Sequence, residues 1–370
     1  MSSLLFSPLA LRGLTLANRI AVSPMCTYSA EAGRATDWHL MHLGQFAVSG
    51  AGLVIAEATA VEARGRISPG CLGLYDDSQV PALARVVDFC KGAGAAAFGL
   101  QLAHAGRKAS TAAPWRGGAP LAAADGGWPV VGPSAVPYDD RSPVPEALDE
   151  SGLAQVRDAF AAAARRADAA GVDLIEIHGA HGYLLHSFLS PLSNRRADSY
   201  GGGRDNRMRF PLEVAAAVRA AWPADKPLGM RVTATDWVAD AESWDIEDTV
   251  AFAKALAGIG IDYIDVSTGG ASPRQKLSVA PGFQTPFAAR VRAETGLPTM
   301  TVGLIFPPRQ AEALLEDGTA DLIALGRGML YDPRWPWHAA RELGEDIAYP
   351  PQYRWATPKR WLDLFGPEAG

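Results

Sequence analysis

Three histidines and a tyrosine lie within nine positions in the segment VDLIEIHGAHGYLLHSFLSPLSNRRADSYGG, residues 172–202. His178, His181, Tyr183 and His186 carry imidazole and phenol groups, which ligate metals, move protons or donate hydrogen bonds. Two imidazoles supply only half of a tetrahedral zinc site, so a metal here would need ligands from other segments. The pattern leaves three hypotheses open: a metal site, two structural histidines, or two N–H donors for a substrate oxygen.

The histidine segment follows one of eight short apolar runs, each too short for a helix and as continuously apolar as a strand buried on both faces. Amphipathic patterns separate the runs, and the clearest covers 151–171, with Ser151 as the expected N-cap and Gly171 as the end. This alternation predicts a single (β/α)8 TIM barrel. The expected strands are 19–24, 52–59, 97–104, 173–179, 227–233, 262–268, 298–303 and 321–326, with further helices at 245–260, 308–318 and 333–344.

A barrel of this kind needs about 250 residues, whereas the chain has 370. The surplus lies in a Pro-, Gly- and Ala-rich segment at 105–150 after the third strand, in 182–204 after the fourth strand, and in a C-terminal arm from about residue 345. Barrel folds place binding and catalytic residues in the loops that follow their strands. We therefore expect residues 1–370 to form one domain whose long loops carry the chemistry.

Side chains at the carboxyl ends of the eight strands converge on one face of a barrel. The last two strands end in TVG and ALGRG, which contribute Gly303, Gly326 and Arg327. Glycine lets backbone N–H groups approach a phosphate, and arginine adds a forked donor, so these loops indicate a site for a phosphorylated ligand. The other strand ends supply Ser23, Pro24, Met25, Cys26, Tyr28, Glu57, Ala58, Gln101, His104 and Arg231.

Arg231 bears on the three histidine hypotheses. A fixed cation is a poor neighbour for a metal dication, and it favours the neutral form of a nearby imidazole. His178 and His181 then become neutral N–H donors. Tyr183 is interpreted either as an uncharged proton donor or as an aromatic side chain that anchors the loop. His186 is assigned no role, since it follows the strand end within the loop.

The composition narrows the class of protein. A formal net charge of −6 and a pI near 5.7 argue against a general nucleic-acid binder. No apolar run is long enough to span a bilayer, and the N-terminus lacks the features of a signal peptide. The three cysteines show no metal-type spacing and fit a reducing compartment, so we expect a cytoplasmic protein. Cys26, after the first strand, is interpreted as a packing thiol, because a nucleophile would need a base partner.

Taken together, these segments resemble the old yellow enzyme family of FMN-dependent ene-reductases, in particular its bacterial branch that includes the xenobiotic reductases. The resemblance covers nearly the whole chain, and the segment after the fourth strand is its most specific part. The matching segments are the N-terminal 16–39, VEARGRISPG (61–70), QLAHAGRKAS (101–110), the histidine segment with its continuation (178–210), and ADLIALGRGMLYDPRW (320–335).

The resemblance implies an FMN site at the mouth of the barrel. Gln101 would hydrogen-bond the pyrimidine edge of the flavin, and Arg231 would lie where negative charge collects on reduction. Cys26 would contact the flavin and tune its potential. The ring would be lined by Ser23, Pro24, Met25, Cys26 and Ala58, and the phosphate would be held by Gly303, Gly326 and Arg327.

The resemblance also implies a reaction. NADPH or NADH would reduce the flavin and leave, and an activated alkene carrying a carbonyl or nitro group would then be reduced in a ping-pong cycle. His178 and His181 would bind the substrate oxygen, Tyr183 would protonate the α-carbon, and Tyr28 would reach the substrate. From the residues alone, a metal-dependent barrel hydrolase and a flavin-free phosphate-binding barrel remain as alternatives.

For assembly, the resemblance implies a homodimer or homotetramer in which the C-terminal arm brings Arg354 or Trp355 near the neighbouring active site. Val302 stands where some relatives carry tryptophan, so a wider pocket is expected. Lys108 belongs to the matching segment QLAHAGRKAS, but the sequence gives it no role.

Overall fold

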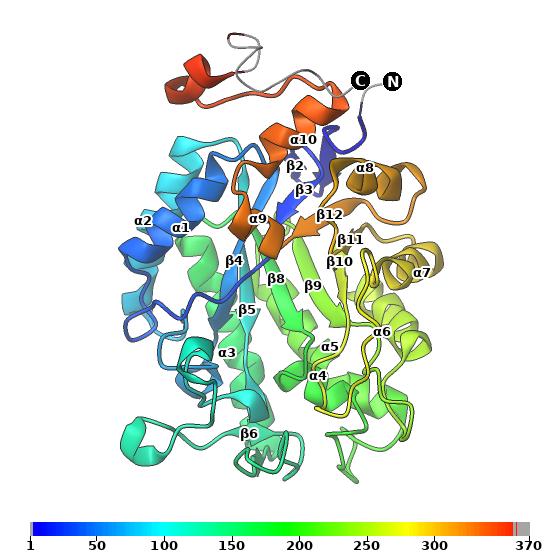
Figure 1. Ribbon diagram of the computed structural model, residues 1–370. Coiled ribbons are helices and arrows are strands. Elements are labelled where there is room, and N and C mark those ends of the chain that lie inside the picture. The colour runs from blue at the N-terminus through cyan, green and yellow to red at the C-terminus, as the bar shows by residue number, and fades with distance from the viewer. Residues whose placement is uncertain (1–2, 358–359, 361–370) are drawn as a thin grey trace.

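The computed structural model describes residues 3–357 and 360, and its centre is a closed barrel of parallel strands surrounded by helices (Figure 1). The predicted (β/α)8 architecture is confirmed, and a strand is present at every predicted position. The barrel strands are β3 (Ile20–Val22), β4 (Leu53–Ala60), β5 (Ala97–Ala103), β8 (Leu174–Gly179), β9 (Leu228–Thr233), β10 (Tyr263–Ser267), β11 (Thr299–Thr301) and β12 (Leu322–Leu325).

Helices cover the outside of the barrel, and the four helices predicted at 151–171, 245–260, 308–318 and 333–344 are present with bounds that agree to within a few residues. One cap was predicted wrongly. The N-cap of α3 is Asp149, whose carboxylate accepts a hydrogen bond from the Gly152 N–H at 2.7 Å, so Ser151 lies inside the first turn. The helices are α1 (Asp37–Ala47), α2 (Val80–Ala93), α3 (Glu150–Ala169), α4 (Leu184–Leu189), α5 (Arg204–Ala221), α6 (Ile246–Ile259), α7 (Thr285–Thr295), α8 (Pro308–Glu316), α9 (Arg327–Tyr331) and α10 (Trp335–Leu343).

The register of the central strands sorts the inward-facing residues into layers. Glu176 pairs with Gln101 on one side and with Gly229 on the other, and Gly229 pairs with Tyr263. The Tyr263 ring lies across Gly229, where a Cβ would come within 2.1 Å of the ring carbon Cζ. The Tyr263 hydroxyl thereby reaches Glu176 Oε2 at 3.1 Å. Only glycine at position 229 leaves room for the Tyr263 ring.

Nearer the carboxyl ends of the strands, His178 pairs with Arg231 and Arg231 pairs with Asp265. Residues paired in this way on adjacent parallel strands point to the same face of the sheet. The register therefore places an imidazole, a guanidinium and a carboxylate side by side, one layer above the Glu176 layer.

An N-terminal hairpin, which the sequence analysis missed, closes the opposite end of the barrel. It consists of β1 (Leu9–Leu11) and β2 (Leu14–Leu16), paired antiparallel. Leu11 and Leu16 are buried in one cluster with residues such as Ile55 and Tyr263. The signal was present, because two short apolar alternations flank the turn Arg12–Gly13, and Arg12 has a left-handed φ of 49°.

The long segment after β5 contains three short 3-10 turns and a small parallel ladder. The turns are Gly106–Lys108, Pro114–Arg116 and Ala123–Asp125, and the ladder joins β6 (Val131–Gly132) to β7 (Glu146–Ala147). In Figure 1 this segment lies at the end of the barrel away from the two chain termini. The segment after β8 was predicted as a loop, but α4 occupies its first part.

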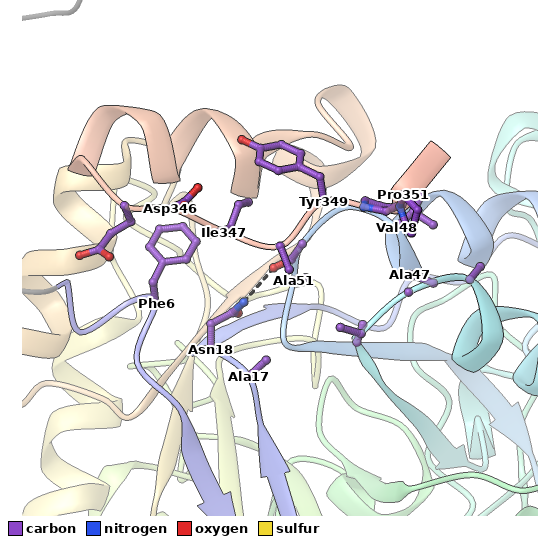
Figure 2. Close-up of a pocket in the computed structure, with 18 of the residues that line it drawn as sticks. Phe6, Ala17, Asn18, Ala47, Val48, Ala51, Asp346, Ile347, Tyr349 and Pro351 are labelled. Atoms are coloured by element: carbon purple, nitrogen blue, oxygen red, sulfur yellow. Dashed lines mark hydrogen bonds between the residues drawn. The ribbon is translucent and has the colours of Figure 1, made fainter. Parts of the chain in front are cut away.

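The C-terminal arm lies at the end of the barrel where the strands begin (Figure 1). Between the arm and the barrel is a cavity of about 410 Å³, lined by residues that precede β3, β4 and β5 and by 345–351. Figure 2 shows Ile347 and Tyr349 of the arm above Asn18, whose amide donates to the Gly50 carbonyl at 2.8 Å. Beyond Thr357 only Arg360 of the arm is described.

We predict that Gly229→Ala lowers the free energy of unfolding by about 1–3 kcal/mol, because the new methyl group displaces the Tyr263 ring in a packed interior. The matched control is Gly92→Ala in α2, where a Cβ meets nothing within 4 Å. Alanine favours a helix over glycine, so the control is expected to gain up to about 1 kcal/mol. Urea unfolding of both variants measures the difference. A Gly229→Ala protein as stable as the unsubstituted one would contradict the packing described above.

Candidate active site

A cavity of about 530 Å³ opens at the carboxyl ends of β9, β11 and β12. Its lining includes Val302 and brings together the four residues that the sequence analysis assigned to an anionic ligand: Arg231, Gly303, Gly326 and Arg327. Its volume lies in the range of roughly 300–1,000 Å³ that is typical of small-molecule and cofactor sites.

Gly303 shapes one wall of this cavity. Its φ is 128°, in a region that side chains rarely adopt, and a Cβ there would come within 2.9 Å of Gln284 Nε2. The Gln284 amide is itself fixed, because it donates to the Val302 carbonyl at 2.9 Å. This position in the cavity lining therefore requires glycine.

The segment after β3 borders the same region. Ser23 is buried, and its hydroxyl accepts a hydrogen bond from Arg231 at 3.4 Å. A Cβ on Gly326 would meet Met25 Sδ at 3.7 Å, which places the end of β12 against the segment that contains Pro24. Burial of the Cys26 thiol, together with the Glu57 carboxylate, raises its pKa well above the usual value. Cys26 is accordingly a neutral thiol at pH 7.

Ala58 and Gln101 become neighbours through a bulge in β4. The register passes from Ala56 to Ala58, so that Glu57 has no partner and Ala58 pairs with Gln101. Glu57 accepts hydrogen bonds from the hydroxyl and the N–H of Thr27 at 2.6 and 3.2 Å. The bulge turns this carboxylate away from the strand face and uses it to fix the backbone next to Cys26.

Beneath the cavity lie two fully buried carboxylates that the sequence analysis did not single out. Asp265 Oδ2 lies 3.1 Å from Arg231 Nε, and Glu176 accepts a hydrogen bond from Gln101 Nε2 at 2.8 Å. Burial and the nearby Asp265 raise the pKa of Glu176 to about 8. Both residues lie inside strands and not at their ends, so only the register reveals that they support Arg231 and Gln101.

His178 and His181 face each other across 3.4 Å between Nε2 of the first and Nδ1 of the second. His178 Nδ1 accepts a hydrogen bond from the Ala180 N–H at 3.2 Å, so in the neutral ring the proton is on Nε2. His181 Nε2 lies 2.7 Å from Ser267 Oγ, and the same hydroxyl donates to Gln284 Oε1 at 3.2 Å.

Burial lowers the pKa values of His178 and His181 well below the usual histidine value, and Arg231 lowers them further. Both rings are therefore neutral at pH 7 and present N–H donors next to a fixed cation. The His181 backbone is in the left-handed region at φ 59°, and its N–H donates to Thr233 Oγ1 at 2.8 Å. A Cβ on Gly270 would come within 2.5 Å of His181 Cα, so the loop after β10 requires glycine at this point.

Tyr183 follows at the N-cap of α4. Its ring lies edge-on to the His178 ring, with centroids 4.9 Å apart. Burial raises the pKa of the Tyr183 phenol well above its usual value, so the group holds its proton at pH 7. Tyr28, at φ 50°, lies edge-on to Trp115 with centroids 5.7 Å apart. Trp115 belongs to the long loop after β5, and spacing gave no hint that it meets Tyr28.

His186 has a structural role that the sequence analysis did not assign. It lies in α4 and not in a loop, and it is fully buried. Its Nδ1 accepts the Gly182 N–H at 2.8 Å, and its Nε2 lies 3.2 Å from Asp236 Oδ1. It therefore fixes the turn that directly follows His181. His104 also turns away from the cavity, since its Nε2 lies 3.0 Å from Glu62 Oε2.

Within residues 3–357 and 360, no group of three or more His, Cys, Asp or Glu side chains has an arrangement that could hold a metal ion. In the same residues, no helix has both the length and the apolar character needed to cross a membrane.

The sequence model of the NADH:flavin oxidoreductase / NADH oxidase family matches residues 4–346 of this chain. The chain is 44% identical over 355 residues to an NADPH dehydrogenase of Geobacillus thermodenitrificans, covering 95% of this chain and 98% of that protein. It is 46% identical over 353 residues to an NADPH dehydrogenase of Listeria innocua, again covering 95% and 98%.

Among solved structures, the fold is similar to that of morphinone reductase. The TM-score is 0.77 at 28% identity, over 95% of this chain and 93% of the other. A 2-naphthoyl-CoA reductase superposes with a TM-score of 0.83 at 24% identity, over 94% of this chain and 53% of the other, which is a likeness of fold.

We predict that neither His178 nor His181 takes up a proton between pH 8 and pH 6, because burial and Arg231 disfavour the imidazolium. Carbon-13 labelled histidine followed by NMR tests this, with His178→Gln and His181→Gln used to assign the two signals. Since both pKa values are depressed in the folded state, stability should fall as the pH drops through about 6.5, where the unfolded chain binds protons. A titration midpoint at or above the ordinary value for either ring would contradict the neutral pair.

Proposed function

The chain belongs to the NADH:flavin oxidoreductase / NADH oxidase family, and on that basis we propose that it reduces the activated C=C bond of α,β-unsaturated carbonyl or nitro compounds. It is an oxidoreductase with FMN as its cofactor and a nicotinamide as its reductant. In the proposed ping-pong cycle, NADPH or NADH reduces the flavin and leaves before the alkene binds. The two-histidine donor pair beside Arg231 is the observation that carries this proposal.

The residues around the cavity fit FMN on two grounds. The cavity has the volume of a cofactor site, and Gly303 in its lining leaves no room for a side chain. In the proposal, Gly303, Gly326 and Arg327 hold the phosphate, and Arg327 supplies the charge. The ring is lined by Ser23, Pro24, Met25, Cys26 and Ala58.

Gln101 and Arg231 are proposed to meet the pyrimidine edge of the ring. The Gln101 NH₂ group is engaged by Glu176, which leaves its carbonyl oxygen to accept a hydrogen bond from the cofactor. Arg231 is paired with Asp265 through Nε and donates through Nη1 to Ser23 at 3.4 Å, and its remaining N–H groups are proposed to meet the edge where negative charge collects on reduction. When bound, reduced FMN supplies the hydride for the substrate β-carbon.

The remaining steps belong to side chains of this chain. His178 and His181 donate hydrogen bonds to the carbonyl or nitro oxygen, which draws electron density from the alkene and stabilises the enolate. Neutral imidazoles suit this task, because they donate without adding a second and third charge beside Arg231. Tyr183 then gives its phenol proton to the α-carbon, and Tyr28 contacts the substrate.

Family membership favours this proposal over the two alternatives, a metal-dependent hydrolase and a flavin-free phosphate-binding barrel. We further propose that residues 1–370 act as one FMN-binding domain in the cytoplasm, with a small-molecule substrate and no nucleic-acid or membrane partner. Val302 in the cavity lining leaves room that a tryptophan would fill.

A homodimer or homotetramer is proposed, with Arg354 or Trp355 near the neighbouring active site. Both residues are exposed, and they lie in Pro351–Ala356, in the arm. The arm packs where the strands begin, away from its own barrel mouth, and this position supports the proposed role toward another subunit.

Tyr183→Phe should slow alkene reduction by about 100-fold, the usual scale of a lost general acid, while flavin reduction by NADPH changes little. Anaerobic stopped-flow of the two half-reactions, with cyclohex-2-enone as oxidant, separates them. Tyr200→Phe is the control. Tyr200 lies in the segment that leads into α5, and its hydroxyl lies 3.3 Å from Glu213 of that helix. Equal slowing of both half-reactions would rule out the proton-donor role. Failure of the unsubstituted, FMN-loaded protein to reduce the enone would overturn the proposed function.

Arg327→Ala should weaken FMN binding by about 10- to 100-fold through the loss of a charge-assisted contact to the phosphate. Riboflavin has no phosphate, so its affinity should stay unchanged. Fluorescence titration of the apoprotein with each flavin measures both constants. Arg309→Ala is the control, because that exposed side chain of α8 forms a surface ion pair with Glu342, at 3.6 Å. A parallel loss for riboflavin would show that Arg327 does not act on the phosphate.

A further inference from the structure

Lys108 is a lysine whose ammonium group is held by backbone oxygens. It ends the 3-10 turn Gly106–Lys108 after β5, and its Nζ donates to the His181 carbonyl at 2.7 Å and to the Gly270 carbonyl at 3.0 Å. No ion pair of Lys108 with a carboxylate occurs among residues 3–357 and 360. Its positive charge is therefore not neutralised by an acidic neighbour.

Two aromatic faces surround the same ammonium group. Nζ lies 5.1 Å from the centroid of the Tyr183 ring and 4.7 Å from that of Tyr138. Both distances fall within the range of cation–π attraction. Lys108 is thus the one lysine among the described residues whose ammonium lies over the ring proposed to donate the proton.

The two carbonyls converge because the backbones that carry them cross tightly. His181 has a φ of 59° and Gly270 a φ of 92°, and a Cβ on Gly270 would lie 2.5 Å from His181 Cα. A Cβ on Gly182 would lie 2.1 Å from the Gly270 oxygen. Lys108 therefore joins the segments that follow β5, β8 and β10 at the place where His181 takes its left-handed conformation.

We propose that Lys108 is a positioning residue for the reduction step, which holds the His181 carbonyl and places a positive charge beside Tyr183 as this phenol loses its proton. The inference rests on the proposed function. In the step, the O–H bond of Tyr183 breaks and a C–H bond forms at the substrate α-carbon. The electron pair of the broken bond stays on the phenolate oxygen until water returns a proton. A nearby cation stabilises that phenolate more than the phenol, so it favours the transfer.

The surroundings of Lys108 also predict how the step depends on pH. Burial, with Arg107 as the next cause, lowers the pKa of Lys108 to about 8. The charge beside Tyr183 is then present below that pH and is lost above it. The titratable and charged groups near the ammonium are Arg107 on its own turn, Tyr138 from the same long segment, and His178, His181 and Tyr183 from the end of β8 and the turn after it. Behind the two histidines lies His186 of α4, paired with Asp236.

The experiment compares Lys108→Met, which removes the charge, with Lys108→Arg, which keeps it. Each is made alone and in the Tyr183→Phe background, on the FMN-loaded full chain. Lys254→Met is the matched control, since that half-exposed lysine of α6 pairs with Glu294 on the surface. Stopped-flow follows flavin reduction by NADPH and flavin oxidation by cyclohex-2-enone, both from pH 6 to pH 9.5.

Lys108→Met should slow flavin oxidation by the enone by about 10- to 100-fold, with flavin reduction changed less than about threefold. The decline of the oxidation rate above about pH 8 should be absent in Lys108→Met and displaced to higher pH in Lys108→Arg. In the Tyr183→Phe background, Lys108→Met should have little further effect, because the two residues act on one step.

If the enone oxidises the flavin of Lys108→Met as fast as that of the unsubstituted protein, the inference is overturned and the proposed function stays intact. The same holds if the loss is undiminished in the Tyr183→Phe background, or equal in both half-reactions, because the lysine would then be only structural. If the unsubstituted protein does not reduce the enone, the proposed function fails and this inference fails with it. If Lys108→Met does not retain FMN, the pH dependence of flavin oxidation in Lys108→Arg decides. A decline of the rate at the same alkaline pH as in the unsubstituted protein would contradict the role of Lys108.

Discussion

The chemistry of this molecule depends on the parallel register of β8, β9 and β10. That register sets His178, Arg231 and Asp265 in one row at the mouth of a closed barrel. A barrel sheet has no free edge along which a strand can slip, and a shift of one residue would turn each of these side chains to the outer face. In this row the Arg231 guanidinium lies between the Asp265 carboxylate on one side and the His178 imidazole on the other. After burial, the Arg231 guanidinium is the next influence on the pKa values of His178 and His181.

Burial and nearby charges then set the protonation states of the groups around this row. Burial and the guanidinium keep His178 and His181 neutral, so they donate hydrogen bonds without competing for protons. One layer deeper, Glu176 has a pKa raised to about 8 and fixes the Gln101 amide. The surrounding loops add tight backbone crossings that only glycine permits, and these set the direction of His181. The site is thus built from a rigid inner row of strand residues and an outer ring of loops.

Much of this was predictable from the sequence, and the failures have physical reasons. The eight strands and the bounds of four helices, α3, α6, α8 and α10, followed from apolar runs and punctuating residues, and the strand ends indicated which side chains would meet. Glu176 and Asp265 were missed because a buried strand has no polar alternation that identifies its inner face. Asp149 was passed over as a cap since Ser151 has the same chemistry two residues later. The contacts of Lys108 and Trp115 depend on how a long loop folds back, which spacing does not encode.

The central claim is that two neutral imidazoles hold the substrate oxygen beside a flavin at the barrel mouth. A crystal structure of the FMN-loaded protein soaked with cyclohex-2-enone tests it most directly. The account predicts the enone oxygen within about 3.2 Å of one ring nitrogen of His178 and one of His181, with the Tyr183 hydroxyl facing the α-carbon. An enone oxygen bound elsewhere in the cavity, or a metal ion seated between the two imidazoles, would contradict it.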